Sequence, residues 1–290
     1  MEKQITDILR NLMACASVTN TEKEIAAETW MLDFFRKQSY FQTYPERCGL
    51  FPIPGDPLRR NTVWALVKCD GADNEEHDGK AAENDITAAE DKNAALTAVP
   101  APTVFFMGHH DVVPADVYGD AAPWAFDLDT IAAHLNRETL STEAYTDLLS
   151  GEWLFGRGCC DMLGGTAVQM ALLAEQAEKV LQKDDKSKKT QNGKNVLVEK
   201  PVKTLRPGPD EAVVDDGDEE ELFGPGKADT CGALLFLSVP DEESFSVGMR
   251  GSLSLLEGLE EQFNLDYRLA ICAEPNQRLA DGKTQVVYSG

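Results

Sequence analysis

The stretch TVFFMGHHDVVP, residues 103–114, carries the strongest fold signal in the sequence. A short apolar run, Thr103 to Met107, passes directly into His109, His110 and Asp111. The same order, an apolar run followed by polar side chains, returns in LFGRGCCD (154–161), LLFLSVPDEE (234–243) and LAICAEP (269–275). In an open α/β sheet the functional crevice lies outside the carboxyl ends of the strands. Four strand-like ends are therefore expected to bring histidine and carboxylate groups to one rim.

The rest of the chain alternates between strand and helix patterns. Apolar runs bounded by turn residues predict strands at 62–69, 103–107, 232–239, 269–273 and 284–288, with helices at about 162–181 and 247–263. Two amphipathic helices open the chain, and Thr21-x-x-Glu24 predicts a capping box at the start of the second. This alternation is typical of the α/β class, a largely parallel mixed sheet covered by helices on both faces.

Two charged segments interrupt this pattern. Residues 70–99 are strongly acidic, and residues 182–230 run from a lysine-rich half into an acidic half without a sustained period. Both are expected to be solvated, disordered inserts. The remaining residues suffice for a single domain.

Composition excludes several classes of function. The 290 residues hold 27 basic and 50 acidic side chains, a net charge of -23, which disfavours nucleic acid or an anionic membrane as partner. The N-terminus has no signal-peptide pattern, and no apolar run approaches the roughly 18 residues of a membrane span, so a cytoplasmic protein is expected. The seven cysteines include no C-x-x-C pair and favour reduced thiols.

The strand-end residues suit a metal site with nitrogen and oxygen ligands. His109 and Asp111, two apart in extended chain, point to the same side, so one can bind a metal while the other orients it. Asp161 at a helix N-terminus suits a bridging carboxylate between two ions. The adjacent Glu242 and Glu243 can divide the roles of general base and ligand.

The motifs GHHDVVP, GRGCCDMLGG, PDEES and AEPN, in this order, resemble the dinuclear-zinc metallopeptidases and amidohydrolases that include aminoacylase and succinyl-diaminopimelate desuccinylase. PWAFD (123–127), WLFGRG (153–158) and GMRG (248–251) look most like the arginine-utilisation, RocB-like branch. The resemblance implies two zinc ions in a complete active site and cleavage of an amide bond in a small peptide or N-acyl amino acid. It implies these roles: ligands His109, Glu243 and Glu274, bridging Asp161, general base Glu242, and Asp111 holding His109.

Two departures from the family pattern matter: the first implies altered surroundings of the metal and not its loss, and the second supports an alternative. Leu163 stands where relatives have a lysine, and their lid domain and last metal-binding histidine have no counterpart up to Gly290. The alternative is a truncated, inactive family member, a partial catalytic domain that keeps the fold and at most one zinc. The sequence leaves the natural substrate and the oligomeric state open.

Overall fold

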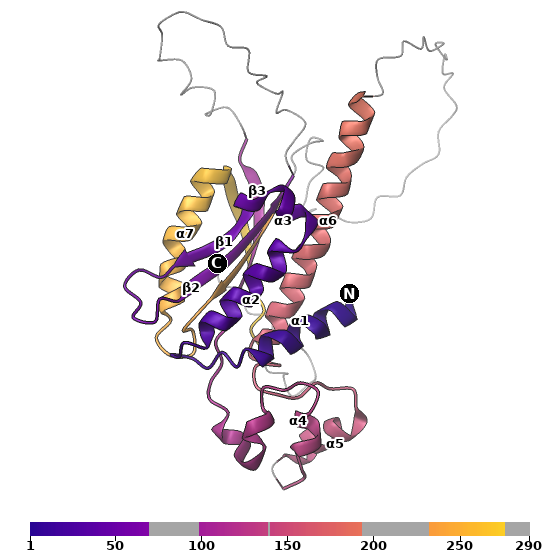
Figure 1. Ribbon diagram of the computed structural model, residues 1–290, viewed down its shortest axis with the longest axis vertical. Coiled ribbons are helices and arrows are strands. Elements are labelled where there is room, and N and C mark those ends of the chain that lie inside the picture. Colours follow the sequence, from indigo (N-terminus) through magenta and orange to yellow (C-terminus); the bar gives the residue numbers. More distant parts are fainter. Residues whose placement is uncertain (70–98, 139, 193–231, 276–290) are drawn as a thin grey trace, which may run out of the picture.

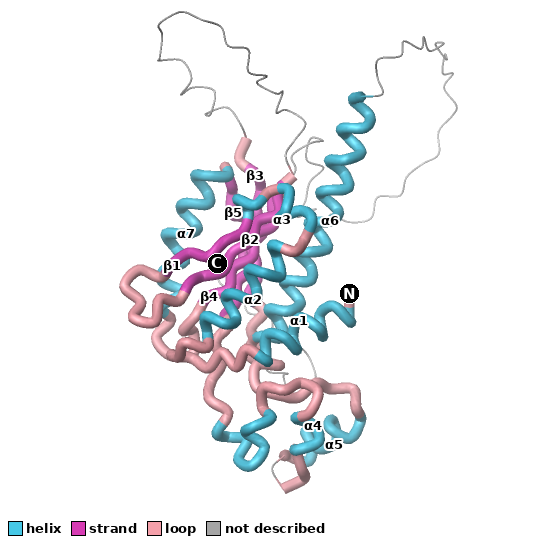
Figure 2. The backbone as a smooth tube through the Cα atoms, viewed as in Figure 1, coloured by secondary structure: helices cyan, strands magenta, loops and turns pink. Residues whose placement is uncertain are grey.

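A computed structural model describes residues 1–69, 99–138, 140–192 and 232–275. Within these ranges the core is a five-stranded sheet in the order β1-β2-β4-β3-β5 (Figures 1 and 2). The strands are β1 (Cys48–Pro52), β2 (Asn61–Lys68), β3 (Ala101–His109), β4 (Ala233–Val239) and β5 (Leu265–Cys272). Four of them match predicted strands, and β1 was not predicted. The predicted strand at 284–288 lies outside the described residues.

The sheet is mixed. β3 runs parallel to β4 and to β5, whereas β2 runs antiparallel to both β1 and β4. The predicted α/β class is thus confirmed, with parallel pairing confined to the β4-β3-β5 side. The apolar run of β2 does not reveal its direction, because a strand buried on both faces has the same composition in either orientation.

Helices cover both faces of this sheet, as predicted (Figure 1). Val63, Ala65 and Val67 of β2 share a buried core with α1, α2, α3 and α6, while Leu66 of β2 and Leu235 and Leu237 of β4 pack with α7 on the other face. The helical segments are α1 (Glu2–Ala14), α2 (Glu24–Arg36), α3 (Ser39–Thr43), η1 (Pro45–Arg47), η3 (Asp116–Trp124), α4 (Ile131–His134), α5 (Thr142–Ser150), α6 (Leu163–Asn192) and α7 (Val247–Phe263).

The structure corrects the predicted insert at 182–230. Helix α6 continues to Asn192, because the lysine and glutamine residues after Leu181 are good helix formers even without an apolar stripe. The remainder of that segment, and residues 70–98 of the other predicted insert, lie outside the described ranges. None of the helices described is long and apolar enough to cross a membrane.

Two further expectations are wrong in detail. Helix α2 begins at Glu24 without a side-chain cap, so the Thr21-x-x-Glu24 capping box does not form. The Glu24 carboxylate instead accepts hydrogen bonds from Arg60 and from the backbone of Asp241. Cys69, directly after β2, is disulfide-bonded and not a reduced thiol.

Gly248, in the first turn of α7, packs directly against the loop after β4. A Cβ atom at this position would overlap the backbone carbonyl oxygen of Pro240, which cannot move aside as a side chain could. Gly248→Ala should therefore lower the free energy of unfolding by about 1–3 kcal/mol, the usual cost of overpacking. Gly258→Ala is the matched control, because no atom lies within 4 Å of a Cβ there.

The control should stabilise the protein by up to about 1 kcal/mol, since alanine is the better helix former. Urea unfolding of the two variants compares them directly. Equal stability of both variants would contradict the close packing of α7 on the loop after β4.

Candidate metal centre

Three parallel strands deliver the candidate side chains to one edge of the sheet. β3 ends at His109, β4 is followed by Asp241, Glu242 and Glu243, and β5 is followed by Glu274. Asp161 arrives from the segment before α6, and its peptide bond to Met162 is cis. Three of the four predicted strand ends converge here, whereas the fourth, at 154–155, is not a strand in the structure.

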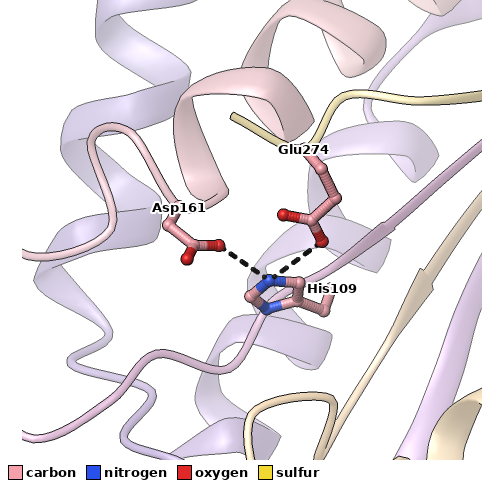
Figure 3. A group of neighbouring side chains, drawn as sticks. All are labelled: His109, Asp161 and Glu274. Carbon is pink, nitrogen blue, oxygen red and sulfur yellow. Dashed lines mark hydrogen bonds and ion pairs between the residues drawn. The ribbon is translucent and has the colours of Figure 1, made fainter. Parts of the chain in front are cut away.

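His109 lies at the centre of the cluster (Figure 3). Its Nε2 atom lies 3.2 Å from Asp161 Oδ1 and 3.4 Å from Glu274 Oε1. The donor atoms of these three residues all lie within 4.8 Å of one another. Glu242 Oε2 lies 3.9 Å from the same Nε2 atom. The imidazole is 1% exposed, whereas Asp161 is 52% and Glu274 42% exposed, so the cluster opens to solvent on its carboxylate side.

Contacts of the Nδ1 atom with Asp111 fix the orientation of the His109 ring. Its Nδ1 atom lies 2.8 Å from the backbone carbonyl oxygen of Asp111 and 3.4 Å from the Asp111 carboxylate. Because a carbonyl oxygen only accepts, Nδ1 carries the hydrogen and donates to it. In the neutral imidazole the lone pair is then on Nε2, directed at Asp161 and Glu274, which is the usual arrangement of a metal-binding histidine.

Asp111 also holds the turn that follows β4. Its two carboxylate oxygens accept hydrogen bonds from the backbone N–H groups of Glu242, at 3.0 Å, and Glu243, at 3.1 Å. The side chain is fully buried. One carboxylate therefore links the orientation of His109 to the placement of the Glu242-Glu243 pair, a second contact that its sequence position did not reveal.

The local charges perturb the acid–base equilibria of the cluster. Burial opposes a charge on His109, but the hydrogen bond and charge of Asp111 and the charge of Glu274 outweigh it and raise the pKa of His109 to about 9. Burial, together with the negative charge of Asp161, raises the pKa of Glu243 and Glu274 above the ordinary value for glutamate. Without a metal ion, the negative charge around His109 is thus offset in part by a proton on its imidazole.

The donor set fits a divalent metal ion. One imidazole nitrogen and two carboxylates converge within 4.8 Å. In the metal-free chain a proton on His109 offsets the two carboxylates, and a bound cation would replace that proton. Nitrogen and oxygen donors of this kind are typical zinc ligands, and zinc bonds to them are about 2.0–2.2 Å long. A modest contraction of the cluster would satisfy that requirement.

The other predicted residues fall into two groups. Glu242 and Asp111 lie beside the three-donor cluster, and Glu243, which does not belong to that cluster in the structure, stays a predicted ligand. The thiol of Cys159 lies 3.4 Å from the Met13 sulfur atom, and its burial raises its pKa to about 12. This cysteine is partly buried and packs against the core, whereas Cys160 is exposed.

Sequence reasoning missed a buried charged group beside the site. Arg60 contacts the carboxylates of Glu24, Asp56 and Asp241, and all four side chains are nearly inaccessible to solvent. Arg60 lies in a Pro- and Asp-containing stretch that resembles an ordinary turn. The contact follows from the antiparallel pairing of β2 with β4. Val63 pairs with Ser238, and the same register places Arg60 alongside Asp241.

Fold and site together define an α/β protein with a candidate metal centre at the carboxyl ends of its parallel strands. No family model matches the chain. The sequence is similar to "Protein RocB" of Bacillus subtilis (strain 168), with 25% identity over 289 residues. It is also similar to "Uncharacterized protein YqjN" of the same organism, with 23% identity over 290 residues. The RocB-like resemblance of the motifs is thereby confirmed.

The matched regions cover 99% of this chain and 38% of each relative, so the chain spans well under half the length of both. Among solved structures, human carnosine dipeptidase 1 aligns with 96% of this chain and 39% of its own, at 14% identity and a TM-score of 0.47.

Proposed function

We propose that this chain contributes the metal-binding sheet of a RocB-like, zinc-dependent hydrolase that cleaves an amide bond in a small peptide or an N-acyl amino acid. The observation that carries the proposal is the convergence of His109, Asp161 and Glu274 within 4.8 Å, with Glu242 at 3.9 Å from the imidazole. Similarity to RocB over nearly the whole chain supports it.

The proposed site residues are of two kinds, metal ligands and a general base. His109, Asp161 and Glu274 would hold one zinc, with Asp161 and Glu243 available to a second. When bound, zinc would lower the pKa of water toward neutrality and polarise the scissile carbonyl group. Asp111 keeps the Nε2 lone pair of His109 directed at the site and fixes the backbone of the Glu242-Glu243 pair.

Glu242 suits the role of general base. Its side chain is 38% exposed, so a water molecule and a substrate can reach it. Its carboxylate can accept a proton from the attacking water and return it to the leaving nitrogen atom, which a positioned carboxylate does efficiently.

A second candidate function rests on the same cluster. Among the described residues, three donors form the group, enough for one ion but not for a bridged pair with terminal ligands on both sides. A protein that binds a single zinc without hydrolysing amides would have this geometry. Hydrolysis of N-acetyl amino acids and dipeptides, lost on chelation and restored by added zinc, distinguishes the enzyme from this alternative.

Metal binding should depend on the strand-end cluster and not on the cysteines. His109→Ala and Asp161→Ala should each lower the bound zinc well below the unmodified chain, which we expect to hold about one tightly bound ion, because each removes one of three converging donors. A Cys159→Ser, Cys160→Ser double variant is the control and should keep the zinc. Metal content after dialysis is the measurement, and loss of zinc in the control alone would overturn the assignment.

A further inference from the structure

A buried charged bridge connects the start of α2 to the turn that carries the proposed base. The Arg60 side chain, 3% exposed, donates to Glu24 Oε1 at 2.8 Å and to Asp241 Oδ1 at 3.0 Å. Its Nη2 and Nε atoms donate to Asp56, at 2.7 Å and 3.0 Å. A stable core does not require such a bridge, since apolar residues of similar volume often replace buried ion pairs without loss of stability.

The bridge acts on the backbone of Asp241. The second oxygen of Glu24 accepts a hydrogen bond from the Asp241 N–H group at 2.9 Å. Asp241 has a φ of 62°, a left-handed conformation that non-glycine residues rarely adopt without support from their surroundings. Its side chain receives Arg60 on one oxygen and the N–H group of Val247 on the other, at 3.3 Å. Backbone and side chain of this residue are thus both held.

Three successive N–H groups at the end of β4 therefore donate to buried carboxylates. Glu24 holds Asp241 from the α2 side, and Asp111 holds Glu242 and Glu243 from the β3 side. Because adjacent residues share rigid peptide planes, fixing these three N–H groups fixes the directions in which the Glu242 and Glu243 side chains leave the backbone. A shift of about 1 Å at such a position can cost on the order of 100-fold in rate.

We propose that Glu24 and Arg60 are positioning residues for the Glu242-Glu243 turn, holding Asp241 in its left-handed conformation so that both glutamates face the metal centre. The catalytic meaning of this role rests on the function proposed above. The contacts themselves do not, so the two can be tested separately. The bridge would make the start of α2, more than 200 residues away in sequence, a part of the active-site architecture.

The test compares two buried glutamates of the same helix. Each oxygen of Glu24 accepts one hydrogen bond, one from Arg60 and the other from the Asp241 N–H group. Glu24→Gln replaces one of these oxygens by an N–H₂ group, so one of the two donors loses its acceptor. Glu28→Gln is the matched control: it is one turn along α2 and equally buried, and its two oxygens accept from the backbone and side chain of Asn61. Both changes disturb the core, but only the first touches the turn.

Hydrogen–deuterium exchange of the metal-free chain, read on peptides spanning 240–247, is the measurement. Exchange in Glu24→Gln should be faster than in the unmodified chain by about tenfold or more, because a broken buried bridge lowers the free energy of local opening. Glu28→Gln should leave these peptides unchanged. Equal protection of the segment in both variants would overturn the proposal, whatever their melting temperatures.

Asp241→Asn keeps the test decisive if Glu24→Gln does not fold. Asparagine also adopts left-handed conformations, so this change weakens the contact with Arg60 without straining the backbone. It should accelerate exchange at Glu242 and Glu243, and unchanged exchange would contradict the bridge. If the exchange results agree but the zinc-loaded protein hydrolyses no amide, the positioning role stands and the proposed function fails.

Discussion

Glu242→Gln should lower kcat of the zinc-loaded protein by at least about 100-fold, the usual contribution of a positioned general base, while the bound zinc stays the same. Glutamine has nearly the same shape and keeps the backbone N–H that donates to Asp111, but its side chain cannot accept a proton from water. Steady-state hydrolysis of N-acyl amino acids, with zinc content measured on the same samples, gives both quantities.

The neighbouring residue provides the contrast for this prediction. Glu243→Gln also keeps its backbone hydrogen bond to Asp111 and has the same change in charge. Since Glu243 is a predicted ligand and not the base, its loss should lower zinc affinity more than kcat at saturating zinc. Hydrolysis by Glu242→Gln at the unmodified rate would remove Glu242 from the mechanism.

Arg60→Met should have the largest effect on stability. The change leaves the buried carboxylates of Glu24, Asp56 and Asp241 without their shared cation. Breaking a buried ion pair from one side typically costs about 3–5 kcal/mol, because the remaining charge is left uncompensated. Urea unfolding at pH 7 measures the loss. Arg10→Met is the control: Arg10 is paired with Asp7 and Asp129 at the surface, and its removal should change little.

The cost of Arg60→Met should shrink as the pH falls from 7 toward 5. Burial already raises the pKa of Glu24, against the opposing hydrogen bond from Arg60, and removal of that hydrogen bond raises it further. A carboxyl group whose pKa is higher in the folded than in the unfolded state takes up a proton on folding, so acid favours the folded variant. A deficit that is constant or larger at pH 5 would contradict an uncompensated carboxylate as its cause.

Local signals predicted much of the fold. The bounds of α7 agree with the predicted helix at 247–263, where Asn264 ends the helix in the left-handed conformation that asparagine tolerates. The strand ends carrying His109, Glu242 and Glu274 followed from apolar runs that stop at polar residues. These features depend on the neighbouring sequence alone, so local sequence patterns suffice to predict them.

Features set by distant partners were not predictable in the same way. Thr21-x-x-Glu24 satisfies the rule for a capping box, but Glu24 instead binds Arg60, 36 residues further along the chain. The direction of β2 depends on its pairing with β4, and that pairing places Arg60 near Asp241. His110, next to the predicted ligand, is fully buried, with Nδ1 3.1 Å from the Ser238 hydroxyl group, a contact that depends on the pairing of β3 with β4.

Anomalous X-ray diffraction at the zinc absorption edge, on crystals of the chain grown with zinc, shows whether His109, Asp161 and Glu274 hold the metal ion. We expect a peak about 2.0–2.2 Å from His109 Nε2 and from carboxylate oxygens of Asp161 and Glu274, the distances of zinc bonds to such ligands. A zinc peak at Cys159 or Cys160, or full zinc occupancy elsewhere with His109 still bound only to protein groups, would contradict the assignment of this cluster as the metal centre.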